Sequence, residues 1–469
     1  MPKDGRAAKA NALDQLHTEE ERRTKGKALR DRVPRASHAG WKPPKNRRDP
    51  VDIVLDSNAD RVEHLIPVRM GRMSQSPFAF YRGAAALMAY DLSSTPVSGL
   101  RVQACGDAHL MNFGAYATPE RNYVFDINDF DETLPGPWEW DLKRLAASVV
   151  IAAQHIKLSQ SEAHRLATAT ARTYREQMND YSSMRVLDVW YDRIFQSHFI
   201  KEADTAALKE RVRKRWEASL AQTRRKAVPD YLFPKLAHFD GGVPKFKDNP
   251  PLIFHPDEKY APKRDDGLRT VLEDYRRTLP EHVRVLLDRF VFCDRAAKVV
   301  GVGSVGTRCV VLLFMAGEND PLILQAKEAR ASVLEPYAGK SLHGHHGERV
   351  VAGQRLMQSA SDMMLGWAVG NDGRDYYVRQ LRDMKASFNM EAADYDLLSI
   401  YSRMCARALA RSHARSGDAA MIAGYLGSST TFDDAIGEFA AEYADQNIKD
   451  YRAFTKAIKD GRIEVFLES

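Results

Sequence analysis

The spacing of apolar residues changes twice along this 469-residue chain, and this restricts the fold more than any other feature of the sequence. Helical periodicity dominates residues 140–217 and returns over 395–413 and 431–459. Between these segments the pattern changes at about residue 291: β-branched or aliphatic runs over 298–300, 308–315 and 322–326 predict antiparallel strands, followed by a helix from Glu348 to Met364 and another strand over 376–381. Earlier in the chain, we expect one capped helix over residues 76–90 and a long loop or insertion over residues 225–268, which are rich in Pro, Lys, Asp and Gly. The sequence therefore predicts an α+β fold in which helices flank a small antiparallel sheet.

Composition narrows the class of protein further. Hydrophobic residues make up 44% and charged residues 28% of the chain, which is typical of a globular protein and not of a disordered or fibrous one. The four cysteines lie far apart and form no CxxC pair, so neither a zinc ribbon nor a thioredoxin-type site is predicted. No apolar run is long enough to cross a bilayer and the first residues lack a secretory signal, so we expect a cytoplasmic protein without a membrane partner.

The positive charge is concentrated at the N-terminus. Residues 1–50 hold 14 Lys and Arg against 7 Asp and Glu, a net charge of +7, whereas the whole chain carries +6. The remaining residues therefore carry −1. We expect residues 1–50 to form a basic arm that is partly helical and partly disordered, either solvated or in contact with a polyanion. Nucleic-acid binding by the rest of the chain is not indicated.

The most informative segment is the polar loop of residues 105–113, which follows a predicted strand. It places Asp107 five residues before Asn112, and a second strand then ends in the acidic cluster of residues 126–132. Phosphoryl transfer needs one carboxylate to orient the acceptor hydroxyl, and an amide oxygen with a second carboxylate to hold Mg²⁺ against a triphosphate. Asp107 fits the first role and Asn112 the second. The second carboxylate is Asp129 or Asp126.

A glycine-rich turn follows much later, at Gly301, Gly303 and Gly306, with Ser304 between them. A dinucleotide-binding loop of this pattern must open a helix, whereas here a strand-like run follows. Strand, glycine turn and strand is the arrangement of kinases, whose next strand carries a phosphate-binding lysine. Lys327 is the candidate lysine, with a solvated strand-end lysine as the alternative. Glu348 at the start of the next predicted helix is a possible acidic partner, and Glu328 and Glu335 are weaker choices.

These motifs resemble those of the protein-kinase-like superfamily, especially phosphotransferases of the aminoglycoside type, whose loop reads approximately His-Gly-Asp-x-His-x-x-Asn. The resemblance implies that Asp107 is catalytic, that His109 matches the second loop histidine and that Cys105 replaces the first. Asp129, followed by Phe130, matches the family's Asp-Phe step better than Asp126 does, although Asp126 lies at the more usual distance from Asn112. The order is reversed relative to ordinary kinases, which implies a circular permutation.

From about residue 40 to its end the chain also resembles a bacterial family catalogued as DUF2252. The segments that carry this resemblance are residues 76–83, 105–113, 125–132, 301–306, 324–329 and 408–427.

Two other side chains have competing interpretations. Arg82 could reach a phosphate or an acidic substrate, although an ion pair is the simpler explanation. His413 could support the loop around Asp107, although the end of a helix near Gly417 explains most of that sequence without chemistry.

The resulting hypothesis has a catalytic-type helical lobe over residues 51–290, a β-rich nucleotide lobe over 291–385 and C-terminal helices over 386–469 that return to the first lobe. The expected function is ATP- and Mg²⁺-dependent phosphate transfer to an unidentified acceptor hydroxyl. The alternatives are a catalytically inactive nucleotide-binding or interaction protein, and a metal-dependent hydrolase that uses His109 and the carboxylates. The hypothesis requires Lys327 and Asp129 to face each other.

Overall fold

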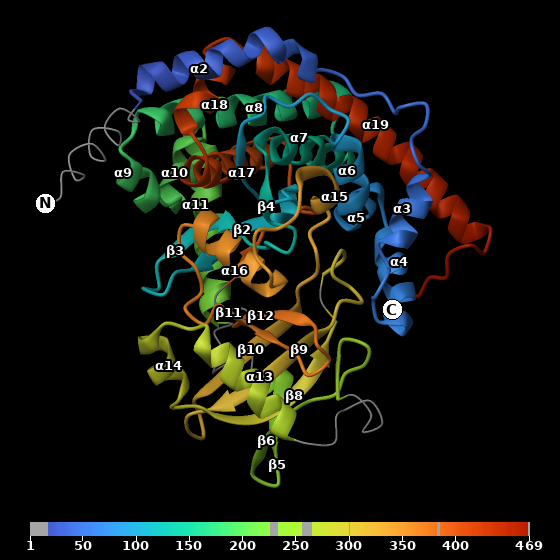
Figure 1. The fold of residues 1–469 in the computed structure, drawn as a ribbon, viewed down its shortest axis with the longest axis vertical. Helices are drawn as coiled ribbons and strands as arrows, with labels where there is room; N and C mark the ends of the chain where they lie inside the picture. Colours follow the sequence, from blue (N-terminus) through green and yellow to red (C-terminus); the bar gives the residue numbers. More distant parts are fainter. Residues whose placement is uncertain (1–16, 226–232, 256–264, 300, 382–384, 468–469) are drawn as a thin grey trace, which may run out of the picture.

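A computed structural model of the chain describes residues 17–225, 233–255, 265–299, 301–381 and 385–467. Figure 1 shows helices packed together in the upper part of the molecule and a twisted sheet in the lower part. The predicted α+β class is confirmed, with small antiparallel sheets joined to a mostly helical body.

The helical part is built around α7 (Trp138–His155), which is buried at every position from residue 138 to 153. Three long helices pack against α7, namely α8 (Gln160–Ser183), α17 (Tyr395–Ser416) and α19 (Thr431–Lys459). The other helices on this side are α9 (Val186–Tyr191), α10 (Gln196–Lys201), α11 (Ala206–Arg225) and α18 (Ala419–Leu426). Among the described residues, no helix combines the length and the apolar character needed to cross a bilayer.

The described part of the N-terminal segment is packed onto this body. Helix α2 (Glu19–Arg32) lies along α18, as Figure 1 shows. Arg30 donates hydrogen bonds to the carbonyls of Tyr425 (2.8 Å) and Gly424 (2.5 Å), and Arg35 donates to the carbonyl of Leu426 (2.6 Å). These arginines satisfy carbonyls at the C-terminal end of α18, a common use of basic side chains. Residues 1–16 of the predicted arm lie outside the described residues.

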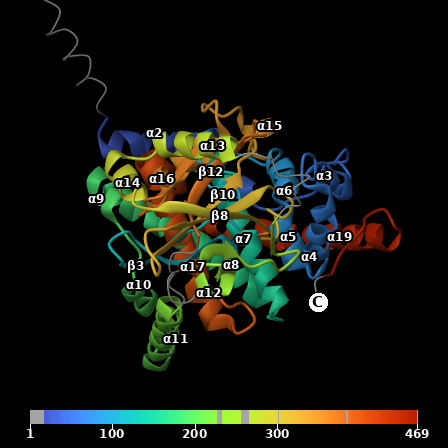
Figure 2. The ribbon, with the colours of Figure 1, turned by 90° about the horizontal axis from the view of Figure 1, so that it is seen from below.

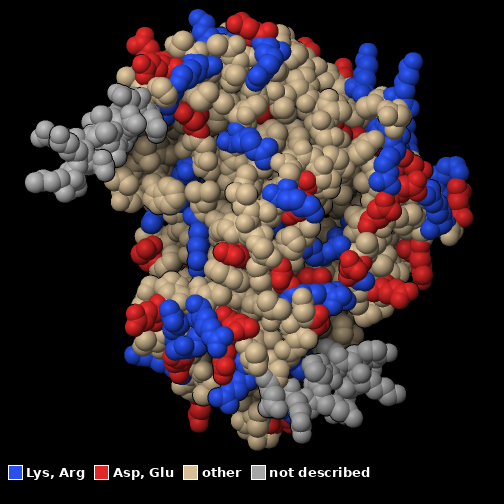
Figure 3. All heavy atoms as spheres, in the orientation of Figure 1, with Lys and Arg blue, Asp and Glu red and all other residues tan. Residues whose placement is uncertain are grey.

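The basic residues do not gather into one surface on the face that Figure 3 presents. Lys and Arg side chains are interspersed there with Asp and Glu. Arg47, another basic residue of this segment, is buried between Asp91 (2.7 Å) and Asp450 (2.7 Å). At least Arg30, Arg35 and Arg47 of residues 17–50 therefore bind the folded body.

The single helix expected from Ser76 onward is divided in two. Ser76 caps α5 (Pro77–Gly83) by accepting a hydrogen bond from the Ala79 amide at 3.0 Å, and Ala84 then leaves helical geometry. The buried Arg69 donates to the carbonyl of Gly83 at 2.9 Å, which takes this group out of a continuous helix. The neighbouring elements are α3 (Pro50–Asp56), α4 (Ile66–Ser74), α6 (Ala85–Leu92) and the 3₁₀ turns η1 (Arg35–His38) and η2 (Glu63–Leu65).

Two small sheets carry the polar loops. Strand β1 (Arg101–Ala104) pairs with β4 (Leu134–Pro137), and β2 (Phe113–Ala117) pairs with β3 (Tyr123–Ile127). The 3₁₀ turn η3 (Leu110–Asn112) lies in the first loop. Strand β13 (Ala386–Ser387) pairs with β2, so the chain returns to the helical part as soon as it leaves the large sheet.

The large sheet has six antiparallel strands in the order β11-β12-β10-β9-β8-β7. Their bounds are Ile253–Phe254 (β7), Val291–Lys298 (β8), Cys309–Met315 (β9), Pro321–Glu328 (β10), Gly366–Val369 (β11) and Asp375–Gln380 (β12). Helices α13 (Asp265–Arg277), α14 (Glu281–Leu287), α15 (Glu335–Ala338) and α16 (His346–Met357) lie around it. Figures 1 and 2 show α13 lying across one face of the sheet.

The segment of residues 225–268, expected to be a long loop, contains regular structure. Helix α12 (Phe233–Leu236) and the hairpin β5 (Ala237–Asp240) and β6 (Val243–Phe246) precede β7. Phe246 and Ile253 are buried against Val311 and Leu313 of the sheet. Their burial outweighs the turn-forming composition of the segment and extends the sheet to a strand before residue 291.

Candidate functional site

The loop after β1 is held by a buried carboxylate of α7. Asp141 accepts hydrogen bonds from the backbone amides of Cys105 (2.6 Å) and Gly106 (2.9 Å). His413 of α17 lies 3.2 Å from the same carboxylate, and its other ring nitrogen contacts the Tyr174 hydroxyl at 2.8 Å. His413 thus supports the loop that carries Asp107, which is the first of the two interpretations of this histidine. A buried polar network of this kind fixes the backbone path.

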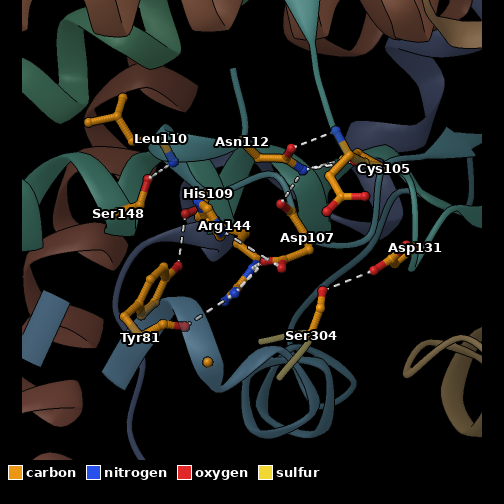
Figure 4. A network of polar contacts seen from close by, with 12 residues as sticks. Tyr81, Cys105, Asp107, His109, Leu110, Asn112, Asp131, Arg144, Ser148 and Ser304 are labelled. Atoms are coloured by element: carbon orange, nitrogen blue, oxygen red, sulfur yellow. Dashed lines mark hydrogen bonds and ion pairs between the residues drawn. The ribbon is translucent and has the colours of Figure 1, made fainter. Parts of the chain in front are cut away.

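Asp107 projects from this loop toward Arg144, and Figure 4 shows the two side chains pointing at each other. Nε and Nη2 of Arg144 lie 2.6 Å and 2.5 Å from Oδ1 of Asp107. Burial alone would lower the pKa of Arg144, but the charge of Asp107 outweighs it and the net shift is upward. Arg144 therefore stays charged beside the Asp107 carboxylate.

His109 lies on the other side of the same carboxylate, with Nε2 3.9 Å from Oδ2 of Asp107. Burial lowers the pKa of His109 to about 3, a larger effect than the opposing charge of Asp107. At neutral pH the imidazole is therefore uncharged, and it can accept or donate a hydrogen bond without competing with Arg144 for Asp107.

Asn112 joins this loop to the acidic cluster. Its Nδ2 donates to the backbone carbonyls of Asp107 (3.0 Å) and Asp129 (2.9 Å), and its Oδ1 accepts from the Asp129 amide (2.8 Å). One buried amide group thus fixes both acidic residues relative to each other, and Figure 4 shows Asn112 beside Asp107.

Lys327 reaches the same place from strand β10. Its Nζ lies 3.6 Å from Oδ2 of Asp129 and bonds directly to Asp131. Asp131 also accepts hydrogen bonds from Ser304 of the glycine turn (3.2 Å) and from the Tyr377 hydroxyl (2.8 Å). Segments almost 200 residues apart in the sequence therefore meet at one carboxylate.

The charges of this cluster compensate each other. Burial raises the pKa of Asp131, but the charge of Lys327 and hydrogen bonds from Lys327 and Tyr377 outweigh it, so the pKa lies below its ordinary value. Burial lowers the pKa of Lys327, but Asp129 and Asp131 outweigh it and the pKa rises. Both groups are therefore charged at neutral pH. Asp129 keeps 40% of its side-chain surface exposed, so it is the accessible carboxylate of the cluster.

The glycine turn is attached to the segment that precedes α5. Arg72 donates to the carbonyl of Gly301 (2.5 Å) and Arg61 to that of Val305 (2.6 Å), and the Val62 amide donates to Gly306 (2.8 Å). Gly306 has a φ of +86°, in the left-handed region that glycine adopts without strain. Its neighbour Ser304 is thereby directed at Asp131. Gly303 lies against the backbone of Arg82, where an added Cβ would be 3.4 Å from the carbonyl oxygen.

Two predicted site residues lie elsewhere. Asp126 is fully buried and accepts hydrogen bonds from Arg411 (2.6 Å) and from the amide and hydroxyl of Ser359 (both 2.8 Å). Because these partners occupy both oxygens of its buried carboxylate, Asp126 has a structural role. Glu348 lies 3.4 Å from His343, and the ionic partners of Lys327 are Asp129 and Asp131 instead. The partner of the lysine therefore comes from the acidic loop and not from α16.

Three residues of the site were not predicted. Asp131 stood within the acidic cluster without an assigned role, and the signal that could have identified it is its position two residues after Asp129. Arg144 lies one helical turn after Asp141, on the same face of α7. Tyr377 is opposite Lys327 in the register of β12 and β10, which the sequence does not reveal.

The chemistry of the cluster fits a divalent cation that is shared with a phosphate. Mg²⁺ is held by one or two protein carboxylates together with phosphate oxygens and water. The residues that could supply such oxygens are Asp129, whose carboxylate is 40% exposed, and Asn112, whose Oδ1 also accepts the Asp129 amide at 2.8 Å. Within the described ranges, no group of three or more His, Cys, Asp and Glu side chains forms a complete metal site.

The fold and the site can be compared with known proteins. No curated protein and no solved structure matches the chain. A family profile described as "Uncharacterized protein conserved in bacteria (DUF2252)" matches residues 61–457, a span that includes the glycine turn, Lys327 and the acidic loop. The chain therefore belongs to the DUF2252 family.

Proposed function

We propose that the chain is an ATP- and Mg²⁺-dependent phosphotransferase with a circularly permuted kinase-like fold, acting on an acceptor hydroxyl. The observation that carries the proposal is the meeting of Lys327 with Asp129, at 3.6 Å, and with Asp131, which also binds Ser304. The two motifs were identified independently in the sequence, and a shared triphosphate and metal site requires them to be adjacent.

Asp107 would orient the acceptor hydroxyl. Its carboxylate is 24% exposed, so one side remains open to a substrate while Arg144 holds the other. A carboxylate paired with an arginine is a weak base, so its contribution is to position the hydroxyl and to accept its proton late in the transfer. Arg144 also places positive charge beside the reacting oxygens.

Lys327 and Ser304 would bind the triphosphate. Both now bond Asp131, and an entering phosphate offers oxygen acceptors that can replace that carboxylate. Asp129 and Asn112 would hold Mg²⁺, which offsets the charge of the phosphates when it is bound. Asn112 fixes Asp129 relative to Asp107 and therefore sets the distance between the phosphate site and the acceptor site.

The path of the chain supports a permuted order. Strand β9 of the glycine hairpin pairs with the lysine strand β10, the neighbour relation expected of kinase motifs. Strand β13 then pairs with β2 of the helical part, and α17 packs on α7 and α8. The segments after the sheet thus complete the part of the molecule that carries Asp107.

One observation favours the second candidate, a nucleotide-binding protein without catalysis. The Asp107 carboxylate and the Lys327 amine are both engaged, by Arg144 and by Asp131. If these ion pairs persist when nucleotide is bound, Arg144 keeps Asp107 a weak base and Lys327 stays on Asp131, so phosphate transfer is lost while binding remains. Both candidate functions predict that the chain binds nucleotide, but only the phosphotransferase predicts turnover.

The test is loss of label from γ-labelled ATP in the presence of Mg²⁺, followed as labelled phosphate when water is the acceptor and as a labelled product when purified hydroxyl compounds are added. Wild type is expected to turn over ATP. Asp107→Asn should lower the turnover rate about 100-fold or more and still bind ATP. Lys327→Met should lose both ATP binding and turnover. Lys245→Met is the matched control, because Lys245 lies on the surface hairpin and pairs with Asp240 at 2.8 Å. Binding without turnover in wild type would support the second candidate. Hydrolysis of other substrates without nucleotide would indicate a metal-dependent hydrolase.

A further inference from the structure

A large cavity lies on the face of the six-stranded sheet that is opposite to Lys327. Its volume is about 1060 Å³, and it is bounded by the sheet, by α13 and by residues 61–65, with one side open to solvent. Successive residues of a strand point to opposite faces, so Ala326 lines this cavity whereas Lys327 points away from it. The cavity is therefore separate from the proposed phosphotransfer site, and an inference about it does not depend on that function.

The sheet forms the cavity by presenting small side chains beneath a helix. Ala326 and Ala368 lie on its floor, whereas Leu268 and Leu272 project from α13 above. Most of the lining is apolar. Protein interiors are normally filled to crystal-like density, and pockets of 300–1,000 Å³ with apolar walls are the usual size of small-molecule sites.

The charged residues of the lining are predominantly basic. Five Lys and Arg side chains contribute to it against three carboxylates. Within the described part of the chain, two of these arginines have no carboxylate partner: Arg61 donates to the carbonyls of Ser57 (2.9 Å) and Val305 (2.6 Å), and Arg295 forms no ion pair. A ligand that balances this charge carries a negative head group.

We propose that this cavity binds an amphiphile with a long apolar body and one anionic head, of the fatty-acid type. The apolar body would lie between α13 and the sheet, and the head would bind at Arg61 and Arg295. Arg61 also holds the glycine turn through the Val305 carbonyl, so the head group would bind next to that turn.

The test uses the fluorescent fatty acid cis-parinaric acid, titrated into the full chain, with competition by a long-chain carboxylate and by the alcohol of equal length. We expect saturable binding of about one molecule per chain. Ala368→Trp fills the cavity and should weaken binding about tenfold or more. Val369→Trp is the matched control, because Val369 is the next residue on β11, is 43% exposed and does not line the cavity.

The anionic head is tested separately by Arg295→Gln, which should weaken the carboxylate about fivefold and leave the alcohol unchanged. Circular dichroism verifies that each variant folds. If Ala368→Trp does not fold, the proposal is judged by the affinities of Arg295→Gln for the carboxylate and the alcohol. The proposal is overturned if wild type shows no saturable binding, if a folded Ala368→Trp binds as wild type does, or if Arg295→Gln affects both competitors equally.

Discussion

Several side chains of the site act on the backbone rather than on a ligand. Asp141 accepts two backbone amides of the loop before Asp107, and Asn112 bonds the main chain of both Asp107 and Asp129. Arg349 donates to the backbone carbonyls of Thr133, Asp131 and Arg330 at 2.5–2.8 Å. These bonds position the carboxylates of the candidate site, so changes to them are expected to lower stability as well as the proposed activity.

Gly106 gives a residue-scale prediction. Its φ is +80°, and an added Cβ would lie 2.3 Å from the carbonyl oxygen of Glu132. Gly106→Ala is therefore expected to lower the free energy of unfolding by about 3 kcal/mol, through strain and a clash with backbone. Gly241→Ala is the control, because Gly241 has a φ of +57° but no atom within 4 Å of the added Cβ. Its cost should be about 1 kcal/mol. Urea denaturation compares the two, and equal losses would contradict the account.

Sequence reasoning grouped Asp107, Asn112, Asp129 and Lys327 because each belongs to a local motif with fixed spacing, and the structure brings these four residues together. The roles of other residues depend on contacts between distant segments. Asp126 has a spacing that suits a metal ligand, yet Arg411, 285 residues away in the sequence, binds it in the core. No local sequence pattern distinguishes an aspartate that can bind a metal from one that pairs with an arginine in the core.

At the level of elements, helix α16 links the sheet to the acidic loop. Its Arg349 is buried and reaches the loop that carries Asp131, while the helix packs against β11 and β12. The expected helix from Glu348 to Met364 is shorter and ends at Met357, and irregular turns lead from there to strand β11, which begins at Gly366 and was not predicted. Periodicity predicted the presence of the helix more reliably than its end, because helix ends depend on capping contacts.

Arg349→Lys gives an element-scale prediction. Lysine carries the charge but cannot donate to three carbonyls from one planar group, so we expect a loss of about 2 kcal/mol in unfolding free energy. Nucleotide binding should weaken as well, because Asp131 loses its backbone support. Arg213→Lys on α11, where the side chain is 53% exposed, should change neither quantity. Thermal unfolding and nucleotide titration measure both effects. A wild-type result for Arg349→Lys would show that α16 does not position the loop.

At the scale of the whole molecule, residues 17–50 belong to the packed body. Composition predicted an arm there because charge is abundant and aliphatic residues are few. The structure instead pairs those charges with helix ends and buried carboxylates, which hydropathy alone cannot reveal. His38 illustrates this, since its ring is buried and contacts the Tyr425 hydroxyl at 2.7 Å.

The pH dependence of stability follows from the buried histidines. Burial, assisted by the charge of Lys143, lowers the pKa of His38 to about 3, and burial lowers that of His109 equally. Between about pH 6.5 and 3 the unfolded chain binds these protons and the folded chain does not, so stability falls as the pH falls. Each histidine contributes about 1.4 kcal/mol per pH unit near pH 5. Urea denaturation from pH 5.5 to 4.5 should show a slope reduced by that amount in His38→Gln and unchanged in the variant His282→Gln, where the side chain is exposed. An unaltered slope in His38→Gln would contradict the burial of a neutral imidazole.

The central claim is that the glycine turn, Lys327 and the early aspartates form one nucleotide site. Calorimetric titration of ATP with and without Mg²⁺ tests it most directly. The account predicts one site per chain, binding weakened about tenfold or more by Lys327→Met, and loss of the Mg²⁺ dependence in Asp129→Asn. Absence of saturable binding, or binding that both variants leave unchanged, would contradict it.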